Sequence, residues 1–378
     1  MEKIRVLVVD DSLFMRQAIT KVISNDQIEV IDIAKNGKEA IEKAIELKPD
    51  IITMDIEMPV MNGLEAVREI LKIQYFPILM LSTLTSEGAN VTMEALSLGA
   101  IDFITKKSAF REIENLKEEL IDKIITLSAN SPFKNKLLRK KLLENMEKNK
   151  DDSEDYSHER IIQSTYPILK RNKPNTHEIK IMTIGISTGG PVALFDLLKT
   201  LPEDFPVPIL IVQHMPPFFT KSLADRLDSI CHINVKEAED GDRLERGMCF
   251  VAPGGKQMGV NRRNQIVLSD LDPKRLFNPS ANVLFESANE HFGKGVLALI
   301  MTGMGNDGTE GLKELSKNGA YIVAQDPETC VVSGMPKSAI DAKVVNEIVT
   351  LNNMPAFLCN LLGTKTSSAK LIKKEFVR

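Results

Sequence analysis

The sequence predicts an α/β protein of two consecutive domains, each built on a doubly wound and mostly parallel sheet. Three observations lead to this fold class. The 378 residues are too many for one ordinary core and suit two. Apolar strands alternate with amphipathic helices in both parts of the chain. Residues 128–178 lack strand signals and differ in composition, so we expect domains at 1–127 and 179–378 joined by this linker.

The composition and charge of the chain exclude several classes of protein. The chain is 43% hydrophobic and 26% charged, which is ordinary for a soluble globular protein. Its net charge of −4 gives no excess of positive charge that would attract phosphate groups, so we expect no nucleic-acid partner. No apolar run reaches the roughly 20 residues that span a bilayer, and we expect neither membrane insertion nor a leader before the first strand. The 4 cysteines lack metal or redox spacing, which favours a reduced, cytoplasmic location.

The first domain shows five strand–helix units in order. The apolar run Ile4–Val9 is typical of a strand buried on both faces of a parallel sheet, and a helix capped by Ser12 follows it. The other units repeat this alternation, which predicts a five-stranded, flavodoxin-like, doubly wound sheet. We expect its further strands at Ile28–Ile33, Asp50–Met54, Pro77–Leu81 and Ile101–Ile104, and its further helices at Gly37–Leu47, Leu64–Ile73, Glu87–Leu98 and up to about Leu127.

Polar side chains stand where four of these strands end. Asp10 and Asp11 follow the first strand, Asp55 follows the third, Ser82 the fourth and Lys106 the fifth. Three converging carboxylates would repel one another unless a cation held them, and hard oxygen ligands suit Mg²⁺. Asp55 could then accept a phosphoryl group whose oxygens contact Ser82 and Lys106. The plainer alternative, solvated loop acids, fits one strand end better than four at once.

Short motifs run through the first domain in a fixed order: Asp10-Asp11, Asp55-Ile56-Glu57-Met58-Pro59, Asn62-Gly63, Ser82, Phe103 and Lys106. They resemble the receiver domain of bacterial response regulators. The resemblance implies that a sensor histidine kinase phosphorylates Asp55 and that Phe103 is the aromatic switch residue. It also implies a Mg²⁺ site made by the side chains of Asp11 and Asp55, the backbone carbonyl of Glu57 and, through water, Asp10. One departure is Lys107, which stands where the family usually has proline.

The linker has a charge pattern of its own. Residues 134–150 are helix-compatible and basic, whereas residues 151–159 are acidic. The two blocks could pair in a helical hairpin or stay solvated, and we favour a partly helical tether. The basic run lacks interleaved aromatic residues, which argues against nucleic-acid binding.

The second domain opens on a serine turn. An apolar run from Ile181 ends in Gly185-Ile186-Ser187-Thr188-Gly189, which fits the Gly-x-Ser-x-Gly elbow that exposes a nucleophile above a sheet. A serine that caps the next helix, Val192–Leu201, is the simpler alternative. We expect further strands at Pro208–Val212, Ile233–Lys236, Met248–Val251, Val296–Ile300 and Tyr321–Ala324, a β-hairpin at Gln257–Ser269, and helices ending near Leu227, at Pro279–His291, after Gly308 and from about Pro355.

Three strand ends of this domain deliver Ser187, His214 and Asp307, the inventory of a nucleophile, a general base and a base-orienting carboxylate. Each has a simpler interpretation. His214 could be structural, Asp307 could cap the helix after Gly308, and the glycine-rich loop around Asp307 could cradle a phosphate. The order Ser…His…Asp also differs from that of α/β-hydrolases. Candidate oxyanion donors are the backbone amides of Thr188, His214 and Met304.

Six longer motifs span the second domain: Gly185–Pro191, Val212–Pro216, Val251–Gly254, Thr302–Gly308, Ala324–Asp326 and Gly334–Pro336. They resemble the chemotaxis protein-glutamate methylesterase/glutaminase family. The resemblance implies hydrolysis of glutamate methyl esters, and deamidation of glutamines, on the cytoplasmic helices of chemoreceptors. It makes the chemotaxis histidine kinase the phosphodonor and requires no cofactor in this domain. Gln257 stands where histidine is common and Asn282 where aspartate is common, and we expect both to affect substrate contacts rather than the reaction.

Two modes of control are open to a receiver fused to a hydrolase. The receiver could dock over Ser187 and release it on phosphorylation, or the phosphorylated receiver could stimulate the catalytic domain directly. Two other classes of protein also stay open: a response regulator whose second domain only binds a partner, and a DNA-binding regulator. Intact triad residues argue against the first. The lack of a helix-turn-helix signature and of a basic face argues against the second.

Overall fold

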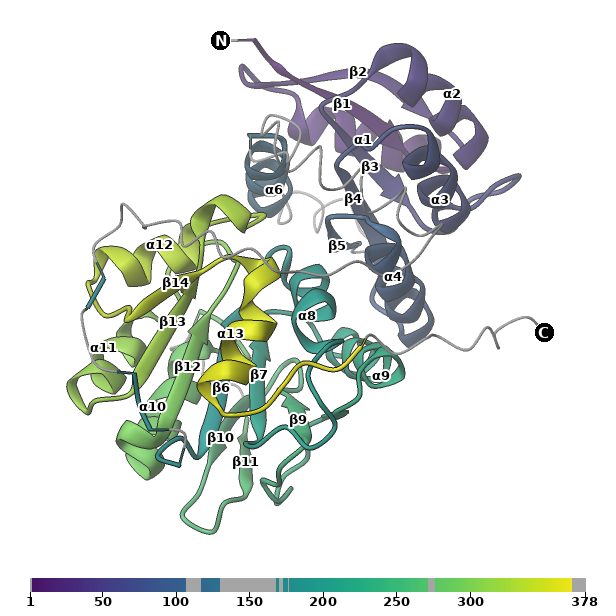
Figure 1. The fold of residues 1–378 in the computed structure, drawn as a ribbon. Coiled ribbons are helices and arrows are strands. Elements are labelled where there is room, and N and C mark those ends of the chain that lie inside the picture. The colour runs from purple at the N-terminus through teal and green to yellow at the C-terminus, as the bar shows by residue number, and fades with distance from the viewer. Residues whose placement is uncertain are drawn as a thin grey trace.

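Two parallel sheets, one in each half of the chain, organise the computed structural model, which describes residues 2–106, 117–129, 168–169, 173–175, 177–270 and 276–368. In Figure 1 the purple N-terminal half lies above the green and yellow C-terminal half. This arrangement confirms the predicted fold class. The tether predicted within residues 128–178 falls largely outside the described residues, and so does Lys107. In the part of the chain that the structure describes, no helix has the length and apolar composition needed to cross a bilayer.

The N-terminal sheet has five parallel strands in the order β2-β1-β3-β4-β5, which is the flavodoxin-like order. Alternate residues of β1 bury into different clusters, Leu7 and Val9 on one face and Val6 and Val8 on the other, so helices cover both faces. The strands are β1 (Ile4–Val9), β2 (Ile28–Ala34), β3 (Ile51–Asp55), β4 (Ile78–Thr83) and β5 (Asp102–Lys106), and the helices are α1 (Leu13–Ile23), α2 (Gly37–Leu47), α3 (Gly63–Ile73), α4 (Ser86–Leu98) and α6 (Lys117–Ala129).

Side chains of the preceding loops start these helices close to the strand ends. The Asn62 side chain accepts a hydrogen bond from the Glu65 backbone, and the Glu65 carboxylate accepts one from the Asn62 backbone, which is a capping box at the start of α3. Ser12 caps α1 and Thr85 caps α4 in the same way, each with its side-chain oxygen. These caps fix the loops that carry the acidic residues.

The C-terminal sheet has seven strands in the order β14-β13-β12-β6-β7-β9-β8, and every neighbouring pair is parallel. The predicted hairpin is a separate antiparallel pair. The strands are β6 (Ile181–Ile186), β7 (Ile209–Gln213), β8 (Asn234–Glu237), β9 (Met248–Val251), β10 (Gln257–Val260), β11 (Ile266–Ser269), β12 (Val296–Ile300), β13 (Tyr321–Gln325) and β14 (Glu347–Val349), and the helices are α8 (Gly190–Leu198), α9 (Phe219–Ile230), α10 (Ala281–Phe292), α11 (Thr309–Lys317), α12 (Gly334–Asp341) and α13 (Met354–Leu361). The sequence analysis missed α12 and β14.

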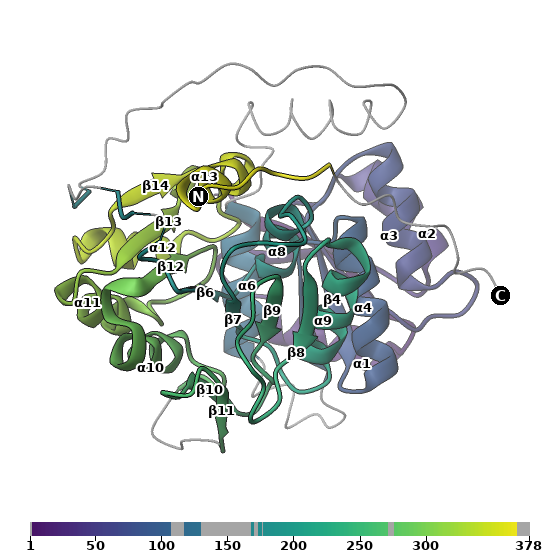
Figure 2. The ribbon, with the colours of Figure 1, turned by 60° about the horizontal axis from the view of Figure 1, so that its bottom comes forward.

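One part of the contact between the two halves is made by α4 and β5 of the N-terminal half and α9 of the C-terminal half. Figure 2 shows α4 beside α9. The rings of Phe103 and Phe219 stack with centroids 4.4 Å apart. The Ser222 hydroxyl donates to Asn90 at 2.7 Å, and Arg226 donates to the Ser97 hydroxyl at 3.1 Å. The predicted switch aromatic, Phe103, therefore lies directly against the C-terminal half.

Candidate active site

The serine turn lies at the centre of the C-terminal sheet. Ser187 follows β6, and its backbone N–H donates to the carbonyl of Thr302 at the end of β12, at 2.9 Å. Two glycines make this turn sterically possible. Gly189 has a φ of 75°, and a Cβ added at Gly303 would lie 2.8 Å from the Cβ of Ser187. The glycines thus let two strand-end loops meet around the hydroxyl.

His214 joins the other two candidate catalytic residues. It follows β7, and its Nδ1 lies 3.1 Å from Ser187 Oγ, while its Nε2 lies 2.8 Å from Asp307 Oδ2. A carboxylate only accepts, so Nε2 carries the proton and Nδ1 is left free to accept from Ser187. The two ring nitrogens have exchanged the places they hold in the chymotrypsin-type triad. The structure thus brings all three predicted residues into one hydrogen-bonded chain.

Asp307 is buried and accepts four hydrogen bonds. Besides His214, its donors are the Ser280 hydroxyl at 2.9 Å and the backbone N–H groups of Ala281 at 2.6 Å and Asn282 at 3.2 Å. Burial alone would raise the pKa of Asp307, but the hydrogen bond and charge of His214, with the donors of Ala281 and Ser280, hold that pKa below its usual value.

The predicted alternative role of Asp307, as the cap of the following helix, is wrong. That helix, α11, begins at Thr309, and its N-cap residue is Gly308, with no side-chain hydrogen bond to the cap. Asp307 instead accepts from the first backbone amides of α10, a helix that lies earlier in the chain. The N-terminus of α10 therefore stabilises the negative charge that orients His214.

Replacing this carboxylate should impair catalysis strongly. Asp307→Asn is expected to lower kcat by about 10⁴-fold, because an amide nitrogen facing Nε2 would favour the wrong histidine tautomer. Asp225→Asn is the matched control, since that carboxylate lies on the exposed face of α9, where it pairs with Lys221. Steady-state hydrolysis of an ester substrate measures both. A loss no larger than that of Asp225→Asn would contradict the role of Asp307.

The same variant has a signature in stability. A folded pKa below the ordinary value of 3.8 means that the ionised carboxylate stabilises the fold fully above that pH, and less as the pH falls through the folded value. The gap in unfolding free energy between wild type and Asp307→Asn should therefore be constant from about pH 7 to pH 4 and shrink below that. Urea unfolding at a series of pH values measures it.

The predicted oxyanion donors differ in what they already bind. The backbone N–H of His214 donates to the carbonyl of Ile186 at 3.2 Å, so this hydrogen bond of the sheet already uses it. The N–H groups of Thr188 and Met304 make no hydrogen bond to any residue that the structure describes. These two amides, one in the serine turn and one in the loop before Asp307, are the donors left for a developing negative charge.

The acidic residues of the N-terminal half converge at the carboxyl ends of β1 and β3. Each of Asp10, Asp11 and Asp55 places one carboxylate oxygen within 4.8 Å of the others. The Nζ of Lys106 lies 2.7 Å from Asp10 and 2.6 Å from Asp55. Burial raises the pKa of Asp55 to about 6; Lys106 opposes this rise and the charge of Asp10 adds to it. Three hard oxygen donors of this kind fit a Mg²⁺ ion.

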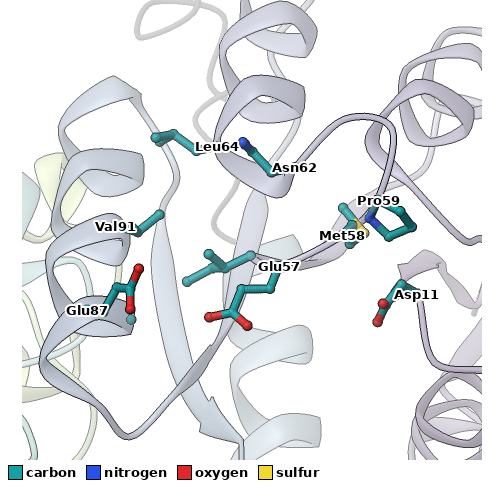
Figure 3. Close-up of a pocket in the computed structure, with 10 residues that line it drawn as sticks. Asp11, Glu57, Met58, Pro59, Asn62, Leu64, Glu87 and Val91 are labelled. Atoms are coloured by element: carbon teal, nitrogen blue, oxygen red, sulfur yellow. The ribbon is translucent and has the colours of Figure 1, made fainter. Parts of the chain in front are cut away.

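A cavity of about 600 Å³ adjoins this cluster. Figure 3 shows the carboxylates of Asp11 and Glu57 extending into it, with Glu87 of α4 across the opening. Ser82 is fully buried nearby, and its hydroxyl donates to the carbonyl of Gly88 at 3.1 Å. No hydrogen bond between the described residues joins Ser82 to Asp55. The predicted contact of Ser82 with a phosphoryl group stays a prediction.

Three further residues lie near the triad, and their contacts were not predicted from the sequence. Phe277 stacks on the His214 ring, with centroids 4.3 Å apart. Gln257 is only 3% exposed, and the side chain of Asn282 accepts from the Gly311 backbone at 2.9 Å. The side chain of Gln257 is bonded to residues 277–280, and Asn282 is half-buried, so the expectation that both affect substrate contacts stays a prediction. No periodicity marks such residues in a sequence.

Both halves of the chain are similar to known proteins. Residues 182–358 match the family model described as CheB methylesterase, and residues 6–118 match that of the response regulator receiver domain. A Colwellia psychrerythraea protein named protein-glutamate methylesterase/protein-glutamine glutaminase is 43% identical over 370 residues, which are 93% of this chain and 97% of that protein. An Aliivibrio fischeri protein of the same name is 41% identical over 376 residues, 96% of this chain and 100% of its own. The solved CheB methylesterase catalytic domain of Thermotoga maritima is 41% identical, has a TM-score of 0.47, and covers 48% of this chain and 98% of that one.

Proposed function

We infer the roles of individual residues from one premise: this chain belongs to the CheB methylesterase family and carries a response regulator receiver domain. It is a protein-glutamate methylesterase and protein-glutamine glutaminase of chemotactic adaptation. Its substrates are the cytoplasmic helices of chemoreceptors, and it acts in the cytoplasm. The observation that carries the catalytic assignment is the bridge of His214 between Ser187 and Asp307.

The triad hydrolyses the substrate in two steps. His214 Nδ1 takes the hydroxyl proton of Ser187 while Oγ bonds to the γ-carbonyl carbon of the modified glutamate. The protonated imidazole then gives that proton to the leaving group, so methanol leaves from an ester or ammonia from a glutamine amide. Water, deprotonated by His214, attacks the acyl-enzyme carbon. The Oγ–carbon bond then breaks, His214 returns its proton to Ser187 Oγ, and a glutamate side chain is left on the receptor. Asp307 stabilises the charged imidazole in both steps.

The tetrahedral intermediate of each step carries a negative oxygen. The backbone N–H groups of Thr188 and Met304 serve as its donors, since neither is bonded within the described protein. Both belong to loops fixed by the sheet, so the donors need no reorganisation during the reaction. The catalytic half needs no cofactor for this chemistry.

The receiver half controls the enzyme through Asp55. Its carboxylate attacks the phosphorus atom of the phosphodonor, for which the partner is the chemotaxis histidine kinase, and the bond between phosphorus and the donor breaks. Asp10, Asp11, Asp55 and the Glu57 carbonyl would hold Mg²⁺, which offsets the negative charge gathered there. Lys106 pairs with the oxygens of the phosphorylated residue, and Ser82 turns from Gly88 toward them.

Docking of the receiver over the catalytic site is the mode of control that the contacts favour. Met304, Val331 and Val332 pack against the apolar cluster of the receiver that includes α6. Val331 touches the serine turn, because a Cβ added at Gly189 would lie 2.5 Å from it. Met304 carries one of the two oxyanion donors. The receiver therefore presses on the loops that surround Ser187, and its release on phosphorylation opens them.

Removing the receiver tests this mode of control. A fragment of residues 179–378 should hydrolyse substrate at least about tenfold faster than the unphosphorylated full chain, the ratio for a closed state favoured about tenfold. It should not respond to a phosphodonor. In the full chain, Ser222→Arg should also raise the basal rate, because it forces a long charged side chain between α4 and α9. Ser229→Arg, on the exposed end of α9, is its control. A fragment no faster than the unphosphorylated parent would exclude docking as the main control.

A further inference from the structure

Residues 276–280 supply two contacts to the His214–Asp307 pair, yet they belong to no strand or helix. The ring of Phe277 lies parallel to the imidazole of His214, with 3° between the planes. The hydroxyl of Ser280 donates to Asp307. Irregular backbone has no ladder of hydrogen bonds to hold it. Besides the bond from the Gly255 backbone N–H to the Asn278 carbonyl at 3.1 Å, the position of this segment depends on side chains from elsewhere.

Gln257 holds the segment with three hydrogen bonds of its side-chain amide. Its Nε2 donates to the carbonyl of Phe277 at 2.8 Å and to the side chain of Asn278 at 2.7 Å. Its Oε1 accepts from the backbone N–H of Ser280 at 2.8 Å. One buried amide therefore fixes both the residue that stacks on His214 and the residue that bonds Asp307.

Gln257 is itself held rigidly. It begins β10, where it pairs with Ser269 of β11, and the next residue, Met258, is fully buried. The hairpin also packs closely on α10: the Ser287 hydroxyl accepts from the Val260 backbone at 2.9 Å, and a Cβ added at Gly259 would lie 2.6 Å from that hydroxyl. The segment 276–280 is thus braced against a fixed part of the domain.

The support that Gln257 gives to residues 276–280 matters because the imidazole ring of a histidine rotates easily about its Cβ–Cγ bond. His214 must keep Nδ1 aimed at Ser187 and Nε2 aimed at Asp307 in one plane, and rotation of the ring weakens both bonds at once. The parallel face of Phe277 restricts that rotation. Ser280 restricts the carboxylate in the same way, from the opposite end of the hydrogen-bonded chain.

We propose that Gln257 is a positioning residue of the triad, which acts through Phe277 on His214 and through Ser280 on Asp307. The proposal rests on the serine-hydrolase function proposed above for the same site. A glutamine amide does not titrate, so Gln257 presents the same donors and acceptor to residues 277–280 at every pH at which the enzyme works. Its loss should slow the chemical step and leave substrate binding nearly unchanged.

The test uses the full chain, activated with a small phosphodonor and Mg²⁺. Labelling of Ser187 by a fluorophosphonate reports the alignment of serine and histidine without any receptor, and methanol release gives kcat and KM. Gln257→Leu should lower both the labelling rate and kcat by about 10- to 100-fold, with KM changed by less than about twofold. Gln265→Leu is the matched control, because that side chain lies in the same hairpin and donates to Gly241 instead.

A second variant separates positioning from mere folding. In Gln257→Glu, the carboxylate still accepts from Ser280 but turns an acceptor toward the Phe277 carbonyl and the Asn278 side chain. Protonation restores one donor, so the labelling rate relative to wild type should rise as the pH is lowered. The proposal is overturned if Gln257→Leu reacts like wild type, or if the relative rate of Gln257→Glu does not change with pH. A wild-type enzyme that the probe leaves unlabelled would overturn the triad itself, and the role of Gln257 with it.

Discussion

Ser187→Ala is expected to reduce kcat for methyl-ester hydrolysis by about 10⁶-fold, the largest effect of any single change in this enzyme. The variant loses the oxygen that bonds to the substrate carbonyl, and neither His214 nor the oxyanion donors supply another nucleophile. The fold should persist, because among the described residues the Ser187 hydroxyl makes a side-chain hydrogen bond only with His214. Methanol release measures the loss, and near-UV circular dichroism measures the fold.

The control for this result is Ser229→Ala, which removes a hydroxyl from the exposed end of α9 and should leave kcat unchanged. His214→Gln should behave nearly like Ser187→Ala, because the two residues act as one unit and their effects do not add. Turnover by Ser187→Ala near the wild-type rate would refute the triad and would require another nucleophile.

Asp55→Asn is expected to abolish labelling by a small phosphodonor in the presence of Mg²⁺. The amide that replaces the carboxylate is not a nucleophile, and Asp10 and Asp11 flank the site without occupying its place at the end of β3. Chelation of the metal should also stop labelling of the wild type, because the clustered carboxylates would then repel the incoming phosphoryl group. Transfer of radioactive phosphate to the protein measures both effects.

Asp26→Asn is the matched control, since Asp26 lies exposed in the loop before β2. It should be labelled like wild type and should respond to phosphorylation with the same rise in methylesterase rate. Undiminished labelling of Asp55→Asn would show that another residue accepts the phosphoryl group. Labelling that is lost while the phosphodonor still raises the rate would separate control from Asp55.

The sequence predicts most of the framework because strand ends are easy to recognise. Continuous apolar runs such as Ile4–Val9 mark strands buried on both faces, and the polar residues directly after them must meet at one edge of a parallel sheet. That argument brings Asp10 to Asp55, and Ser187 to His214, without any knowledge of distances. It does not reveal which ring nitrogen of His214 faces the serine.

What the sequence does not reveal is which distant backbone a side chain reaches. Asp307 stands directly before Gly308, the start of a helix, and local capping rules assign it to that helix. In the structure it reaches α10 instead, because the start of α10 lies beside the turn that carries Asp307: a Cβ added at Gly308 would lie 3.3 Å from the Cβ of Ala281. The hydrogen-bond partners of Gln257 cannot be predicted for the same reason, since its three bonds join residues about 20 positions apart along the chain.

Two short elements, β14 and α12, are also not predicted, because their hydrophobic patterns are weak. Strand β14 has only 3 residues, with a glutamate among them, and it is stabilised by pairing at the sheet edge with β13. Helix α12 has 8 residues, of which the first is glycine and the third is proline. Neither shows a run of apolar residues at strand or helix spacing long enough to identify it, so tertiary contacts decide both.

The apolar contact between the two halves gives the resting enzyme a thermal property. Phe103 lies on Phe219, and Met304 and Val331 lie on the apolar cluster of the receiver, so the closed arrangement removes these surfaces from water. Association of this kind has a negative heat-capacity change and weakens on cooling. Cold therefore slows the chemical step while it favours the open arrangement. Because these two effects oppose each other, we expect the background rate of methyl-ester hydrolysis to vary less with temperature than the rate at the exposed site does.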